Sequence, residues 1–326
     1  MIVSWAQRGE MLPVTRRVRA YFAPVQRATS APAVFDPAKN PYMLLDAPPP
    51  PWIDAGEAVN LERKAGTQLK TIRSGSRDAA QKQFRTDLDA SVEFDFLQWG
   101  KLQLALSSGS QQMNLLAETF GTPDAASGGT PAGAVGLAPG STSNELVVGA
   151  GNVAAFLAGD LVAVDNDYQQ QTGYVGAGIS GAFVKNAADV HGDGHYIRRV
   201  TFNVGRVLGT TPTTVVLSQN LLGGTPTPTM GVQKIMGFVD REGGSFVQEW
   251  SALFVYEGES GARIYFHYPR VQPAQPAAEK RFAISDGFEG LSLHCALRAL
   301  PATDSNDSET VVCYRSYVPA PYTAVY

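Results

Sequence analysis

The chain has 326 residues, of which 44% are hydrophobic and 17% are charged, and it contains 33 glycines and 21 prolines. This length allows one large or two medium domains, and so many Gly and Pro residues favour many turns and therefore many strands. The net charge of −4 argues against a protein whose whole surface binds nucleic acid, and no apolar run is long enough to span a membrane.

The first 60 residues predict one strand followed by an irregular arm. Thr15 to Ala23 has the alternation of a strand, with Val18, Ala20 and Phe22 on one side. Prolines then recur at positions 24, 32, 37, 41 and 48–51, where they cannot donate hydrogen bonds to a sheet. A long irregular arm is unusual inside a compact monomer, so we expect residues 25–51 to lie on a neighbouring subunit.

A long hairpin is predicted next. A polar segment that begins near Val59 leads through Ser74-Gly75-Ser76, a typical turn, towards a second strand. Five bases lie along the segment towards its tip: Arg63, Lys64, Lys70, Arg73 and Arg77. They could pair with carboxylates of another subunit, or the segment could be an ordinary solvated loop.

Residues 84–96 have the most regular pattern in the chain. Every even position from Phe84 to Phe96 is apolar or Thr, and every odd position is polar. A period of two predicts a strand with one face in a core and the other in water. We call the carboxylates of the wet face the acidic stripe: Asp87, Asp89, Glu93 and Asp95.

A short amphipathic helix should follow this strand. Trp99, Leu102, Ala105 and Leu106 recur at steps of three and four residues, which places them on one side of a helix. Gly109 is a plausible end, because Gly adopts the left-handed conformation after a helix at little cost.

The middle of the chain predicts a small inserted domain. Residues 123–142 and 223–231 are linkers by composition, rich in Gly, Ala, Ser, Thr and Pro. Five strand-like runs lie between them: Glu145–Val148, Leu161–Val164, Gly173–Val184, His195–Leu208 and Thr214–Leu217. We therefore expect an all-β domain at 143–222, inserted into a discontinuous domain made of 1–122 and 232–326.

The last third returns to alternation. Residues 263–268 and 291–298 predict two strands, and 311–317 should form a hairpin with the second of them. Cys295 and Cys313 flank the loop of this hairpin, and we expect two buried, reduced thiols.

Patterns typical of catalysis are weak. His267 and His294 lie on the polar faces of predicted strands, as surface or interface residues would. The segment His191-Gly192-Asp193-Gly194-His195 could bind a divalent ion, but it lacks an evident fourth ligand and also fits a polar turn. We expect no enzyme, no cofactor and no metal.

The order of these elements resembles that of phage tail-tube (major tail) proteins. The first half carries Ser91-Val92-Glu93-Phe94-Asp95-Phe96, followed by Leu102-Gln103-Leu104-Ala105-Leu106-Ser107-Ser108-Gly109. The second half carries Ile264-Tyr265-Phe266-His267-Tyr268-Pro269-Arg270-Val271 and then Leu293-His294-Cys295-Ala296-Leu297. The similarity covers roughly residues 12–120 and 236–318, and the insert departs from the simplest members.

The resemblance implies an all-β, tail-tube-like β-sandwich or barrel with one short helix. It also implies hexameric rings that stack into a hollow tail tube of the virion, assembled in the host cytoplasm. Its partners would be other copies of the chain and tape-measure, terminator or sheath proteins, with DNA only in transit and no membrane. The alternatives are another virion ring, a capsid decoration protein, or a carbohydrate-binding module.

Two hypotheses about sites follow. The acidic stripe is either the wet face of a strand or a lumen wall that repels passing DNA. Contacts between subunits are expected from the five bases of the hairpin and from large side chains in segments that lack the periodicity of an internal core: Tyr42, Leu44, Leu45, Trp52, Tyr322 and Tyr326.

Overall fold

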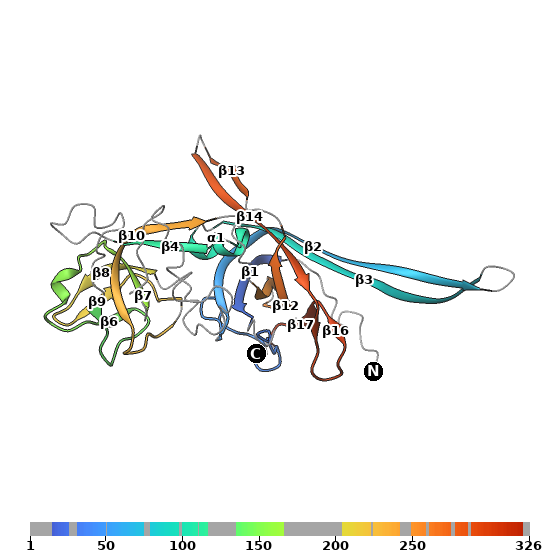
Figure 1. Cartoon of the computed structure of the whole chain (residues 1–326), viewed down its shortest axis with the longest axis horizontal. Coiled ribbons are helices and arrows are strands. Elements are labelled where there is room, and N and C mark those ends of the chain that lie inside the picture. Colours follow the sequence, from blue (N-terminus) through green and yellow to red (C-terminus); the bar gives the residue numbers. More distant parts are fainter. Residues whose placement is uncertain are drawn as a thin grey trace, which may run out of the picture. The chain divides into compact units, whose positions relative to one another are not determined.

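The computed structural model (Figure 1) describes residues 15–25, 31–49, 51–74, 79–97, 100–109, 111–116, 135–165, 204–222, 224–241, 249–258, 261–274, 278–285 and 288–321. The chain divides into two compact units. Unit 1 comprises residues 1–25, 32–99 and 249–326, and unit 2 comprises residues 26–31 and 100–248.

Unit 1 is an antiparallel barrel. Its strands are β1 (Thr15–Pro24), β2 (Ile53–Ser74), β3 (Ala79–Phe96), β11 (Trp250–Gly258), β12 (Arg263–Pro273), β13 (Ala278–Ser285), β14 (Phe288–Leu300), β15 (Ala302–Thr303), β16 (Thr310–Val311) and β17 (Tyr314–Val318). Eight of them form one sheet in the order β13-β14-β3-β2-β1-β11-β12-β17, and β12 also pairs with β14. This second pairing closes the ring β14-β3-β2-β1-β11-β12.

The core of unit 1 is aromatic. Even-numbered side chains of β1, β11 and the part of β3 from Ala90 to Phe96 pack in the barrel interior, where Phe94 lies 6.5 Å from Phe22, 4.7 Å from Phe96 and 5.1 Å from Phe254, between ring centroids. The burial of Phe94 and Phe96 confirms the predicted apolar face for this part of the strand, while the side chains of residues 84–87 lie outside the described residues.

The predicted hairpin of the last third is wrong in its pairing. β17 pairs with β12, whereas β14 pairs with β13, β3 and β12. The connection between β14 and β17 instead forms its own two-stranded sheet, β15–β16. Alternation shows which residues share a face of a strand, but it does not identify the neighbouring strand.

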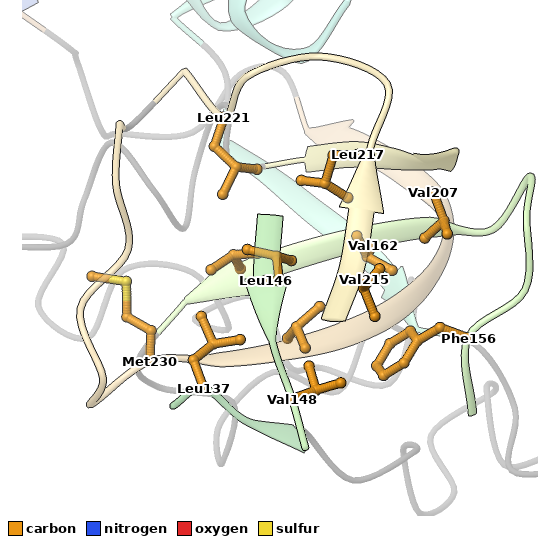
Figure 2. Packing of buried hydrophobic residues seen from close by; sticks show 12 residues of the cluster. Leu137, Leu146, Val148, Phe156, Val162, Val207, Val215, Leu217, Leu221 and Met230 are labelled. Atoms are coloured by element: carbon orange, nitrogen blue, oxygen red, sulfur yellow. The ribbon is translucent and has the colours of Figure 1, made fainter. Parts of the chain in front are cut away.

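Unit 2 is a half-barrel sheet with one helix. Its elements are α1 (Lys101–Ser108), β4 (Gln111–Leu116), β5 (Val135–Gly136), β6 (Glu145–Val147), the 3-10 helix η3 (Val153–Ala155), β7 (Leu161–Asp165), β8 (Val204–Thr210), β9 (Thr214–Leu217) and β10 (Gly231–Arg241). The strand order is β4-β10-β7-β8-β9-β6, and β5 adds to β10. Figure 2 shows the sheet curling around buried aliphatic side chains such as Leu146, Val162, Val215 and Met230.

Together these two sheets confirm an all-β fold with one short helix. The helix also ends as predicted. Gly109 has a φ of 65°, and its N–H donates to Ala105 O at 3.0 Å.

The boundaries of the units differ from the predicted domain boundaries. Unit 2 begins at Gly100 and ends at Gln248, so it includes α1, β4 and β10. The reason is that β10 pairs with β4 on one side and with β7 on the other, which makes both strands part of the inserted sheet. Met230, expected in a linker, is buried in the core of unit 2. The predicted strand Gly173–Val184 lies outside the described residues.

Candidate functional site: assembly surfaces of unit 1

Strands β2 and β3 continue beyond the barrel as a two-stranded ribbon. β1 pairs with β2 only between Ile53 and Glu57, and β14 pairs with β3 only from Ala90 to Phe96. From Ala65 to Ser74, among the strands that the structure describes, β2 pairs with β3 alone. At about 3.3 Å per residue, this part is roughly 30 Å long. Figure 1 shows it running beyond the barrel as a two-stranded ribbon.

The basic residues of this ribbon differ in their environment. Arg63 is engaged within its own subunit: its Nε donates to Tyr268 Oη at 3.0 Å, and its guanidinium lies 4.7 Å from the centroid of the Phe266 ring. Lys64 Nζ lies 3.8 Å from a carboxylate oxygen of Glu93. Lys70 and Arg73, closer to the tip, are exposed, and Arg77 lies outside the described residues.

The acidic stripe is largely paired with bases of the same subunit. Asp89 Oδ1 lies 3.5 Å from Arg298 Nε on β14, and Glu93 lies beside Lys64. Asp95 is buried and is therefore not on a wet face. The side chain of Asp87 lies outside the described residues. The stripe is thus close to charge-neutral where the structure describes it, because β2 and β14 place bases beside it.

Asp95 belongs to a small polar cluster. It accepts hydrogen bonds from Asn60 Nδ2 at 2.9 Å and contacts His294 Nδ1 at 2.8 Å. Burial alone would raise the pKa of Asp95, but the hydrogen bonds from Asn60 and His294 outweigh it and lower this pKa below its ordinary value. His294, expected at the surface or at an interface, is half-buried and contacts Asp95 of its own subunit.

We expect Asp95→Asn to lower the free energy of unfolding of unit 1 by about 1–3 kcal/mol, because it weakens charge-assisted hydrogen bonds in a buried site. The matched control Asp89→Asn should change it by less than about 1 kcal/mol, since both partners of the Asp89–Arg298 pair are exposed. Urea denaturation of the two variants provides the comparison. Equal losses in the free energy of unfolding would show that Asp95 contributes no more to stability than an exposed carboxylate does.

The irregular arm packs on its own barrel. We call residues 31–52 the strap. Its side chains Phe35, Met43, Leu45 and Trp52 are buried in one cluster with the odd-numbered side chains of β1, β11 and β12. The prediction that this arm lies wholly on another subunit is therefore wrong for Leu45 and Trp52. Between the buried residues Met43 and Leu45, the alternate side chains Tyr42 and Leu44 face solvent, with 40% and 72% of their surface exposed.

Side chains of the barrel satisfy the strap's backbone. The strap contains prolines and is irregular, so its backbone lacks the hydrogen-bond ladder of a sheet and needs other partners. Side chains of β11 and β12 hold Ala33: Ser251 Oγ accepts from Ala33 N (2.9 Å), and His267 Nε2 contacts Ala33 O (3.0 Å). Three further side chains of β1 and β12 donate to strap carbonyls: Tyr265 Oη to Pro41 O (2.7 Å), Arg263 Nη1 to Met43 O (2.6 Å) and Tyr21 Oη to Leu45 O (2.9 Å).

Alternation alone does not predict that these side chains hold the strap. His267, Tyr265 and Arg263 share the odd face of β12, and each ends in a hydrogen-bonding group, which was the available signal. His267 is only 3% exposed, so its assignment to a polar surface was wrong. The reason is that the strap covers the outer face of β12, so this strand is buried on both faces. Its outer face can therefore carry long side chains whose polar ends hydrogen-bond to the strap.

Neither cysteine shows a sign of reactivity. They form no disulfide; Cys295 is buried and Cys313 is half-buried. Burial raises the pKa of both thiols, which disfavours the reactive thiolate.

Among the described residues, no group of three or more His, Cys, Asp or Glu side chains could hold a metal ion. The segment His191–His195 lies outside these residues, as do Tyr322 and Tyr326. Within the same part of the chain, no helix has the length and apolarity needed to cross a membrane.

Neither a scan of protein-family models nor a search of curated proteins finds a match to this chain.

Proposed function

We propose that copies of this chain assemble into hexameric rings that stack into a hollow phage tail tube, a passive conduit for genome ejection. The proposal rests on the order of the sequence motifs and on one structural observation, the β2–β3 ribbon. In this proposal the protein belongs to the virion tail, and tape-measure, terminator or sheath proteins are its partners.

The ribbon supports assembly because it is poorly stabilised within one subunit. A two-stranded hairpin alone is at best marginally stable in water, and its two edges carry unpaired N–H and C=O groups. Beyond Ala65 no other described strand pairs with it. A neighbouring subunit would supply the missing contacts, and the exposed Lys70 and Arg73 would lie at that contact.

The proposed lumen wall is the part of the odd face of β3 that carries Asp89 and Glu93, because Asp95 is buried. The Asp89–Arg298 and Glu93–Lys64 pairs make this face nearly neutral rather than strongly negative. A neutral, hydrated wall would still avoid binding DNA, since its described basic side chains, Lys64 and Arg298, are paired with carboxylates and do not form a row that could release counterions from phosphates.

Shortening the ribbon provides the test. Residues 68–87 are replaced by Asn-Gly, a two-residue turn suited to a hairpin, so that the cross-strand pair Thr67–Leu88 closes it. We expect full-length protein to form tubes in negative-stain images, and the shortened variant to yield folded rings or monomers that do not stack.

The matched control is Lys70→Ser with Arg73→Ser, which keeps the ribbon and removes its described exposed bases. Exposed ion pairs contribute only up to about 1 kcal/mol each, so this variant should still stack. If the shortened variant forms tubes as the full-length protein does, the ribbon has no role in stacking. Full-length protein that stays monomeric at high concentration would contradict the proposed function, and single rings would favour another virion ring.

A further inference from the structure

One buried histidine lies at the point where the strap meets the barrel. His267 projects from β12 under the strap, and its Nε2 lies 3.0 Å from the carbonyl oxygen of Ala33. A carbonyl oxygen can only accept, so Nε2 carries a proton and donates it to Ala33 O. The ring of Trp52, at the other end of the strap, contacts the imidazole edge-on at 5.5 Å between centroids.

Both backbone groups of Ala33 are held by the barrel. Ser251 Oγ accepts from Ala33 N at 2.9 Å, while His267 donates to Ala33 O. The strap beyond Ala33 covers an apolar face that includes Tyr21, Leu253 and Val255. Losing the contacts at Ala33 and Trp52 would therefore loosen both ends of this cover together.

We propose that His267 is a proton-operated latch: the neutral imidazole holds the strap on the barrel, and protonation releases the strap from the apolar face of β1, β11 and β12. The latch belongs to the fold of unit 1 and does not depend on the proposed tail-tube function.

The groups that face His267 offer little to stabilise a cation. On β17, Tyr314 stacks on the imidazole at 5.6 Å, and its hydroxyl donates to Asp304 at 2.7 Å. Burial and Asp304 raise the pKa of Tyr314 to about 12, so this phenol stays neutral. On β12 itself, Tyr265 donates to the strap and Arg263 is cationic. β11 presents Ser251, and the strap presents Ala33 and Trp52. No described carboxylate contacts the ring.

Burial lowers the pKa of His267 to about 4, and the bond to Ala33 opposes this only partly. In an opened strap the imidazole would return towards an ordinary pKa of about 6.5. Between these values the open form binds more protons than the closed form. The contribution of the neutral imidazole to closure is therefore fully present above about pH 6.5 and is lost as pH falls towards 4, so the equilibrium constant for strap opening should rise roughly 100-fold from pH 7.5 to pH 4.

Hydrogen exchange of the full chain, followed by mass spectrometry at pH 7.5 and pH 4 and corrected for intrinsic rates, tests the latch. In the wild type, peptides that cover residues 31–52 should lose protection by up to that factor, while peptides from 204–217 in unit 2 keep theirs. His267→Gln should abolish this pH dependence, because its amide can still donate to Ala33 O and does not titrate.

Ser251→Ala is the matched control. It removes the other bond to Ala33 without changing a titrating group, so protection should fall equally at both pH values and the pH dependence should remain. If His267→Gln folds poorly, NMR titration of His267 in the wild type replaces it, and its midpoint should coincide with strap opening. The latch would be overturned if the strap of His267→Gln opened at the same pH as that of the wild type. It would also be overturned if strap opening in the wild type did not follow the titration of His267.

Discussion

Replacing Trp52 with Ala should lower the free energy of unfolding of unit 1 by about 3–5 kcal/mol. Trp52 is buried, and its ring packs edge-on against Phe35 at 6.3 Å and against His267 at 5.5 Å. The substitution would leave a cavity between strap and barrel that the irregular strap can fill only in part. Calorimetric or urea unfolding of a dilute, unassembled sample measures the loss within one subunit.

Leu44→Ala is the control from the same segment. Its side chain is 72% exposed, so the variant should unfold within about 0.5 kcal/mol of the wild type. If Leu44 contacts a neighbouring subunit, its effect should instead appear in assembly. A Trp52→Ala protein that is as stable as the wild type in dilute solution, but fails to assemble, would restore Trp52 as a contact between subunits.

Phe94→Ala should have an effect of similar size, about 3–5 kcal/mol, through the barrel interior. Phe94 is 1% exposed and contacts the rings of Phe22, Phe96 and Phe254 from β1, β3 and β11. Aromatic pairs contribute roughly 0.5–1.5 kcal/mol beyond their buried area, so losing one ring weakens several contacts at once. Because these three strands all belong to the barrel, the loss should destabilise all of unit 1.

Ile72→Ala on the ribbon provides the comparison. Ile72 is 48% exposed, and it pairs with Lys82 in the part of the ribbon that lies beyond the barrel. It should leave the unfolding of unit 1 almost unchanged. Denaturation curves for both variants, followed by circular dichroism, decide the matter. Similar midpoints for Phe94→Ala and the wild type would mean that the even face of β3 is not the core.

Local sequence by itself determined the elements that depend on near neighbours. The period of two over residues 84–96 identified the buried face of β3, and Gly109 identified the end of α1, because each signal depends on residues a few positions apart. The β2–β3 hairpin was predictable for the same reason: its strands are adjacent in the chain, and the few residues between them have a polar sequence typical of a turn.

Only the tertiary structure decided which distant segments meet. Arg298 lies beside Asp89, and His267 holds Ala33, although each pair is separated by more than half of the chain. Alternation cannot identify such partners, because any strand with a suitable face satisfies it equally well. The strap shows this most directly: its irregular sequence indicated a partner, and the barrel of its own subunit, through Tyr265, Arg263 and Tyr21, provides it.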